Sequence, residues 1–386
     1  MLRRLPLGFV GVAIAAIAIA ACSSSDATQS ISVGPNFGSQ TLYASNVTQN
    51  AVSIYGTTPK STSGPIYQIG GSNTTLAGPQ YLTFDSTSDL WVTDWLSSTS
   101  AGGILEFKAQ ATGNVIPYQS LALGNIRPRG IADFQYTFTG ETTTTDVLAI
   151  AVTNPSQPSS FVSGIEFFYT SLLTSPYQTI AGPATGLNAP SGIAVDKNSN
   201  VYVSNLQNAS VEVFALPSAS PTSSPSPTPS PSPTPTATPV GSTPTPSPTP
   251  VPTPTPLNIA PIATISGSAS TIGQPTGIAL DSNGYIYVSD QASTVLSPTK
   301  PTPAILIFNP LGGSQSAPAK YIAGSNTLLV APTDVKVDSN GNVYVADEAS
   351  GTGVVYVYAE GSTGNVAPSA TLKSPGAVIG LGLLTP

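Results

Sequence analysis

The chain has 386 residues and a net charge of −7, with only 8% of its residues charged, so uncharged polar side chains must cover most of the surface. Its 11 Lys and Arg residues form no basic cluster, which argues against a nucleic-acid partner. The chain has no His and one Cys, Cys22, which excludes His general bases, His-ligated zinc, Ser-His-Asp or Cys-His catalysis and an internal disulfide.

The N-terminal segment has the form of an export signal. Arg3 and Arg4 precede an apolar run over residues 5–21, which is short for a membrane-spanning helix. Residues 19–22 (IAAC) resemble the lipobox of bacterial lipoproteins, a family in which the Cys thiol receives diacylglycerol and becomes the mature N-terminus. The resemblance implies a signal peptide over residues 1–21 and lipidation at Cys22. Residues 22–40 are rich in Ser, Thr, Gln and Gly, which predicts a flexible tether.

The same resemblance predicts a location. The mature protein is expected to be lipid-anchored and extracytoplasmic in a bacterial cell envelope. Ser23, rather than Asp, follows the Cys, which favours the outer membrane or the cell surface. The alternatives are an uncleaved membrane anchor and a twin-arginine signal built on Arg3 and Arg4.

The rest of the chain repeats one phrase six times, most clearly at residues 190–214, 275–290 and 332–347. Each copy has a Pro, a short apolar strand ending in Asp, an Asn-Gly-like turn and a second strand ending in Asp or Asn. A hairpin of this kind cannot bury its apolar face alone, whereas radial stacking of several units forms a β-propeller. The sequence therefore predicts an all-β propeller with four-stranded blades.

The four strands of each blade are called A to D, from the axis outward. Strand A is expected at residues 80–84, 129–134, 191–195, 276–280 and 333–337. Strand B is expected to end at Asn46, Asp94, Asn154, Asn205, Asp290 and Asp347. Strand C is expected at residues 52–55, 103–107, 164–168, 211–214, 304–308 and 354–358, and strand D at 66–70, 119–123, 177–181, 262–266, 320–324 and 369–372.

The first unit begins at strand B and so lacks a strand A. Residues 376–384 (GAVIGLGLL), which follow Pro375, have the length and apolarity of that missing strand. If the C-terminal strand joins the N-terminal blade, the ring closes without an open sheet edge. Residues 41–386 are therefore predicted to form a six-bladed propeller.

The units resemble NHL repeats, whose consensus runs Pro, Gly-Ile-Ala-Val-Asp, a Gly turn, Tyr-Val-Ala-Asp and a Val-Phe strand. Residues 192–196 (GIAVD) and 344–347 (YVAD) carry the match, which spans residues 42–384. The second and third units depart most, with Trp91 and Trp95 flanking Asp94 and an expanded A–B turn at residues 134–147.

Residues 217–256 consist almost entirely of Pro, Thr and Ser and interrupt the fourth blade between strands C and D. Such a run is expected to be a disordered, extended polyproline-II segment of about 3.1 Å per residue rather than a domain boundary. It is either a tolerated loop insertion or a spacer whose Ser and Thr side chains accept O-linked sugar.

The residue after each Pro is expected near one mouth of the central channel. These positions are Gln80, Arg129, Ser191, Thr276, Thr333 and Gly376. Arg129 is the one charged member and suits an anion or a carbonyl group. The alternative is a solvated polar rim.

The Asp residues that end strand A have two interpretations. Asp85, Asp196, Asp281 and Asp338 are either calcium ligands or caps of the A–B turn. An EF-hand-type loop needs Glu at its twelfth position, where Ala292 and Ala349 stand, so capping is favoured and no metal is predicted. Likewise, Trp91, Trp95 and Phe107 are expected to fill gaps between blades rather than to form a sugar platform.

These features predict a non-catalytic binding or scaffold module for a protein or glycan partner, with no cofactor and no bound metal. The alternative is a metal-dependent lactonase or hydrolase of the gluconolactonase-like propeller class, which uses a Glu/Asn/Asp metal cluster at the channel. The inner strands offer only Asp133, Asp334 and Lys336 for such a cluster. An amidating lyase of the NHL-propeller type relies on His-ligated zinc, which the absence of His excludes.

Overall fold

The computed structural model describes residues 40–56, 64–96, 101–138, 140–154, 163–171, 173–216, 255–311, 317–349 and 352–384. The predicted signal peptide, Cys22 and the tether up to residue 39 lie outside the described residues, as do residues 217–254 of the Pro-rich segment. All described residues belong to the compact unit at residues 34–386. No helix among them is long and apolar enough to span a membrane.

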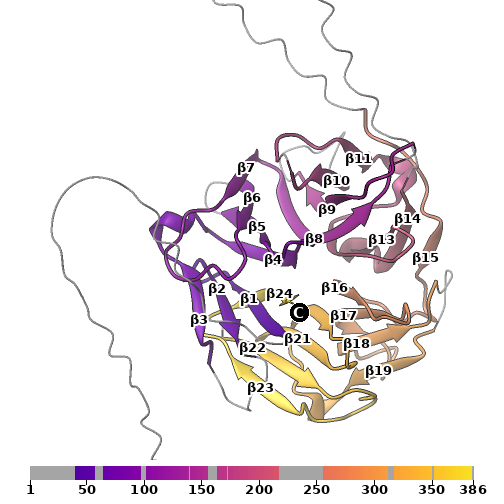
Figure 1. The fold of residues 1–386 in the computed structure, drawn as a ribbon. Helices are drawn as coiled ribbons and strands as arrows, with labels where there is room; N and C mark the ends of the chain where they lie inside the picture. Colours follow the sequence, from indigo (N-terminus) through magenta and orange to yellow (C-terminus); the bar gives the residue numbers. More distant parts are fainter. Residues whose placement is uncertain are drawn as a thin grey trace, which may run out of the picture. The chain divides into compact units, whose positions relative to one another are not determined.

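The described strands form six antiparallel four-stranded sheets arranged as the blades of a ring (Figure 1). Blade 1 contains β24 (Val378–Leu384), β1 (Thr41–Asn46), β2 (Ala51–Tyr55) and β3 (Tyr67–Gly70). Blade 2 contains β4 (Pro79–Phe84), β5 (Leu90–Leu96), β6 (Ala101–Phe107) and β7 (Gln119–Gly124). Blade 3 contains β8 (Arg127–Tyr136), β9 (Thr145–Thr153), β10 (Ser163–Tyr169) and β11 (Gln178–Ala181).

The other three blades follow the same order from the axis outward. Blade 4 contains β12 (Pro190–Val195), β13 (Asn200–Asn205), β14 (Ser210–Ala215) and β15 (Ala263–Ile265), so both strands that flank the Pro-rich segment belong to it. Blade 5 contains β16 (Pro275–Leu280), β17 (Ile286–Ser293), β18 (Thr302–Phe308) and β19 (Lys320–Ala323). Blade 6 contains β20 (Pro332–Val337), β21 (Val343–Ala349), β22 (Thr352–Tyr358) and β23 (Ala370–Lys373).

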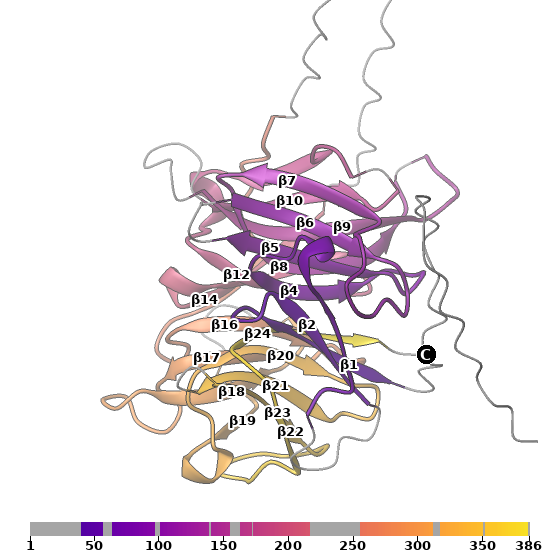
Figure 2. The ribbon, with the colours of Figure 1, turned by 90° about the vertical axis from the view of Figure 1, so that its left-hand side faces the viewer.

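The C-terminal strand closes the ring. Strand β24 pairs antiparallel with β1, with Thr41 opposite Leu384 and Leu42 opposite Leu383. Figures 1 and 2 show the yellow strand β24 beside the indigo strand β1. The predicted six-bladed propeller with a shared first blade is therefore confirmed, and this closure leaves blade 1 with its full set of four strands.

The register of blade 3 differs from the prediction. In blades 2, 5 and 6 the first Pro of strand A pairs with the polar residue near the end of strand B, as in Pro79 with Asp94. In blade 3, Pro128 pairs with Val152, and β9 ends at Thr153. Asn154 is thus not the equivalent of Asp94, because the pairing across the long β8–β9 hairpin places an apolar residue at that position.

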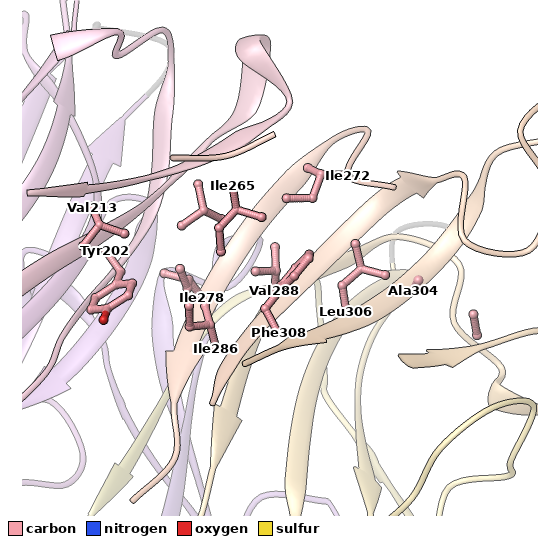
Figure 3. Packing of buried hydrophobic residues seen from close by; sticks show 12 residues of the cluster. Tyr202, Val213, Ile265, Ile272, Ile278, Ile286, Val288, Ala304, Leu306 and Phe308 are labelled. Carbon is pink, nitrogen blue, oxygen red and sulfur yellow. The ribbon is translucent and has the colours of Figure 1, made fainter. Parts of the chain in front are cut away.

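Apolar side chains from neighbouring blades form the core. Figure 3 shows Tyr202 and Val213 of blade 4 packed beside Ile278 and Val288 of blade 5 in one such cluster. Burial of a Val, Leu or Ile side chain stabilises the fold by roughly 1.5–3 kcal/mol. This packing fixes neighbouring blades against each other and so positions the innermost strands.

Three staples join the blades in pairs. Each staple is a short parallel bridge between strand D of one blade and the C–D loop of the next, together with an Asn side chain from that loop. The bridges are Ile69 with Gly113, Ile180 with Leu257 and Ile322 with Gly364. The Asn Oδ1 atoms of Asn114, Asn258 and Asn365 accept hydrogen bonds from the backbone N–H groups of Asn73, Ala184 and Asn326 at 2.7–2.8 Å.

The staples require glycine at one position. Gly71, Gly182 and Gly324 have φ near +120°, and a Cβ atom on any of them would lie 2.6 Å from the stapling Asn Oδ1. The staples recorded among the described residues therefore join blade 1 with 2, blade 3 with 4 and blade 5 with 6, and each such pair of blades is called a module below.

Candidate functional site

Four of the five polar residues predicted at the channel mouth line one cavity. Gln80, Arg129, Thr276 and Thr333 line a cavity of about 750 Å³. Ser191 is fully buried behind it, and its Oγ atom accepts a hydrogen bond from Arg129 Nη1 at 3.2 Å. The structure thus brings these five positions together from blades 2 to 6.

The prediction that Gly376 is the sixth residue at the channel mouth is wrong. Strand β24 pairs through Val378 with Asn46, so Val378 holds the position that Pro holds in the other blades. Ile379 therefore follows it at the cavity, and Ile379 is among the lining residues. Pro375 imitates the start of a repeat, but pairing with β1 sets the register three residues later.

Buried hydroxyl groups hold the main chain beneath these residues. A Ser or Thr on strand B donates to the carbonyl of the cavity residue in the next blade and accepts an N–H from its own blade. The donor bonds run from Ser45 Oγ to Gln80 O at 2.6 Å, from Thr93 Oγ1 to Arg129 O at 2.7 Å and from Ser204 Oγ to Thr276 O at 2.6 Å. These bridges satisfy buried or partly buried main-chain groups close to the axis.

Tyr81 occupies the axis of the channel. Its position is Gly in four other blades, where close approach of neighbouring inner strands leaves no room for a Cβ atom. The Tyr81 side chain reaches from blade 2 to blades 4 and 6, where its hydroxyl group lies 3.1 Å from Ser191 Oγ and donates to Thr333 O at 3.2 Å. Burial, with a smaller contribution from Asp334, raises the pKa of Tyr81 to about 12, so the phenol stays neutral. Tyr81 thus forms part of the cavity wall at the axis.

Two arginines face the cavity from β8. Arg127 and Arg129 flank Pro128, and both line the cavity. Neither belongs to any ion pair recorded among the described residues. The Nε atom of Arg127 is buried without a hydrogen-bond partner, and its guanidinium lies 5.9 Å from the Trp95 ring.

The pKa of Arg127 reflects this environment. Desolvation and the positive charge of Arg129 lower it to about 10, so the charged form is retained at neutral pH at a cost in stability. The one carboxylate among the described lining residues is Glu348, an exposed residue of β21. The cavity therefore has a positive wall formed by two guanidinium groups for which the described residues record no ion pair.

The rest of the lining comes from repeated positions that sequence reasoning missed. Leu206, Gln291 and Glu348 each follow the polar residue of strand B in blades 4, 5 and 6, and Asn188 and Gln274 lie just before the Pro of strand A. Arg127 also lies before its Pro. The signal was their position one or two residues from residues that the repeat already marked.

The repeated Asp residues cap turns, as the favoured interpretation predicted. Each Oδ1 atom accepts backbone N–H groups two and four residues further along, at 2.8–2.9 Å, at Asp85, Asp196, Asp281 and Asp338. Asp94, Asp290 and Asp347 instead accept N–H groups from the loop before strand A of their own blade. In the described part of the chain, no group of three His, Cys, Asp or Glu residues is placed to hold a metal ion.

The remaining predicted residues lie apart from the cavity. Asp334 is fully buried, 3.3 Å from Lys336 Nζ, and accepts the N–H of Leu381. Burial, followed by the charges of Asp146 and Asp85, raises the pKa of Asp133 to about 8. Three further side chains belong to the core, as expected, because they are at most 8% exposed: Trp91, Trp95 and Phe107.

No protein-family model and no curated protein matches the chain. Among solved structures, a protein of unknown function from Bacteroides caccae has a TM-score of 0.53 at 9% identity, covering 90% of this chain and 99% of that chain. A Lactobacillus plantarum protein has a TM-score of 0.44 at 11% identity, covering 90% and 99%. A Xanthomonas campestris gluconolactonase has a TM-score of 0.36 at 13% identity, covering 78% of each chain. The first likeness supports the propeller fold, and at such identities activity does not follow from it.

Proposed function

We propose that this propeller is a non-catalytic binding module that holds an anionic group of its ligand in the cavity at the channel mouth. The observation that carries the proposal is the pair Arg127 and Arg129, which line a cavity of about 750 Å³ and form no ion pair with any carboxylate in the described part of the chain. Ligand cavities are commonly of about 300–1,000 Å³. Guanidinium groups bind carboxylate, sulfate and phosphate through paired N–H donors.

We also propose that the blades are NHL-type repeats and that a lipid on Cys22 anchors the protein outside the cytoplasm. The GIAVD and YVAD phrases support the first part, and the IAAC sequence after an apolar run supports the second. On this proposal the partner is a protein or a glycan of the cell envelope. Metabolic labelling with a fatty acid tests the anchor: wild-type protein should incorporate label and Cys22→Ser should not, whereas equal labelling would contradict lipidation.

The anion site is tested by calorimetric titration of the full chain with sodium sulfate. Arg127→Gln and Arg129→Gln should each weaken sulfate binding about tenfold or more. Lys320→Gln removes the same charge from an exposed position on the outer strand β19, so it should leave binding within about twofold. Equal weakening by all three variants would show a diffuse charge effect and would contradict a site.

The lactonase alternative makes a separate prediction. Such an enzyme needs a metal cluster at the channel, whereas the described cavity lining offers two guanidinium groups and one carboxylate. We expect the full chain to hydrolyse a δ-lactone no faster than buffer, with or without Ca²⁺, Mn²⁺ or Zn²⁺. Metal-stimulated turnover that is lost on chelation would replace the binding proposal with the enzymatic one.

A further inference from the structure

One side of the cavity carries uncharged polar side chains that can accept hydrogen bonds from a ligand. The Nε2 atom of Gln80 donates to Gly78 O at 3.0 Å, and the Nε2 atom of Gln291 donates to Pro332 O at 3.2 Å. Each amide thus uses one of its two N–H donors within the protein and keeps the other. The Oε1 atoms, for which no partner is recorded among the described residues, remain as acceptors.

Two hydroxyl groups add to the same side. Thr276 Oγ1 donates to Pro332 O at 2.8 Å, and Thr333 Oγ1 donates to Val378 O at 3.1 Å. A hydroxyl group has one hydrogen, so each of these oxygens can only accept a further hydrogen bond. Blades 2, 5 and 6 therefore present acceptors to the cavity.

The opposite chemistry comes from blade 3. Arg127 and Arg129 carry donors and positive charge and have no acceptor atom. A ligand that satisfies both sides carries an anionic group at one end and several hydroxyl groups, which can both donate and accept, elsewhere. Sulfate, phosphate and acetate meet only the first condition, and a neutral sugar meets only the second.

The shape of the cavity adds a further restriction. Tyr81 occupies the axis, and Ile379 lies beside it in the lining. A glycan cannot thread along an axis that a side chain fills, so the cavity admits the end of a chain. Ile379 and Leu206 also offer apolar surface for the C–H face of a sugar ring.

We infer that the cavity binds a terminal sugar residue that carries an anionic group, such as a uronic acid at the end of an acidic glycan. This inference rests on the proposed anion site and adds the hydroxyl-bearing ring. The charged group lies against Arg127 and Arg129, while the ring hydroxyls donate to Gln80, Gln291, Thr276 and Thr333.

The test is calorimetric titration of the full chain with five probes: methyl glucuronide, methyl glucoside, sodium sulfate, glucose 6-sulfate and glucose 6-phosphate. At least one anionic sugar should bind about tenfold more tightly than sulfate and than the neutral glucoside. Which of the three anionic sugars binds best identifies the charged group as carboxylate, sulfate or phosphate.

Two variants separate the hydroxyl side from the charged side. Gln291→Leu and Thr333→Val should weaken the best anionic sugar about tenfold and leave sulfate within about twofold. Gln178→Leu, a matched change on the outer strand β11, should alter neither. Thermal unfolding of each variant verifies that it is folded. If Gln291→Leu does not fold, Thr333→Val still provides the test.

The outcomes distinguish this inference from the function on which it rests. If sulfate and the anionic sugars bind equally and Arg127→Gln weakens both, the anion site stands and the sugar inference fails. If the neutral glucoside binds as tightly as the anionic sugars, the inference also fails. If no anion binds, both proposals fail.

Discussion

The hydroxyl group of Tyr81 in blade 2 lies 3.1 Å from Ser191 Oγ in blade 4. The same Ser191 Oγ accepts a hydrogen bond from Arg129 in blade 3. The residue at the axis is therefore coupled through one hydroxyl group to an arginine of the cavity. This coupling makes the position of Arg129 depend on Tyr81.

Tyr81→Phe should destabilise the protein and weaken anion binding. The change removes the bonds to Ser191 and to Thr333 O, and a buried carbonyl left without a partner costs about 1–3 kcal/mol. Chemical denaturation measures the loss, and sulfate titration measures the effect on Arg129. Tyr118→Phe is the control, since Tyr118 is 64% exposed, and an equally large loss in both variants would contradict the role of Tyr81.

Ser204→Ala should destabilise the ring by about 1–3 kcal/mol. The hydroxyl group bridges two blades by donating to Thr276 O at 2.6 Å and accepting the N–H of Gly192 at 2.7 Å. Its removal leaves both main-chain groups unsatisfied inside the protein. Urea denaturation should show a lower midpoint for Ser204→Ala. The control Ser339→Ala, at an exposed turn, should leave the midpoint unchanged. An unchanged midpoint for Ser204→Ala would mean that water replaces the hydroxyl.

Glu166→Gln should remove part of the pH dependence of stability. Glu166 is 5% exposed, its Oε2 atom has no hydrogen-bond partner, and burial raises its pKa to about 7. Because the folded pKa exceeds the unfolded value, the neutral carboxyl group is tolerated below about pH 4.5. As the pH rises from about 4.5 through about 7, ionisation of this carboxyl group favours the unfolded state, so the free energy of unfolding falls. The wild-type protein should therefore lose roughly 3 kcal/mol relative to Glu166→Gln between pH 4 and pH 8.

Unfolding free energies of both proteins across that pH range test the Glu166 prediction. Glu212 is the matched control because it holds the equivalent position in blade 4, where Ser210 and Thr264 donate to its two oxygens. Glu212→Gln should lower stability at pH 8, the opposite sign to Glu166→Gln. Parallel pH curves for wild type and Glu166→Gln would show that Glu166 does not titrate in this range.

Arg127→Met should stabilise the protein while it weakens sulfate binding. Burial and Arg129 lower the pKa of Arg127, so its charged form destabilises the folded state. Allowing for solvent screening, removing this charge should stabilise by about 1 kcal/mol. A higher unfolding temperature with weaker sulfate binding is the expected pair of results. A lower unfolding temperature would mean that packing of the Arg127 stem against Trp95 outweighs the charge.

The repeat made most of the fold predictable, because Pro and Asp mark the same points of each blade. The closing strand followed from counting, since one strand A was missing at the N-terminus. The errors at Asn154 and Gly376 share a cause: local phrases imitate the repeat, whereas pairing with the neighbouring strand decides the register. The sequence also marks the staples with Asn-x-x-Pro at Asn114, Asn258 and Asn365. This motif was missed because it lies in the C–D loops, outside the strands that the repeat identifies.

The candidate site was predictable only in part. The position after each Pro identified four lining residues, because every inner strand meets the channel mouth at the same point. Tyr81 could not be recognised in this way. Its role depends on a side chain crossing to two blades that are distant in sequence, which no local pattern encodes.

The three staples also indicate how a ligand would affect the association of the blades in the ring. The recorded bridges lie within the modules, at the seams between blades 1 and 2, 3 and 4, and 5 and 6. Gln80 belongs to the first module, Arg127 and Arg129 to the second, and Gln291 and Thr333 to the third. A molecule that contacts all of them would join the three pairs of blades to one another across seams at which the described residues record no bridge of this kind.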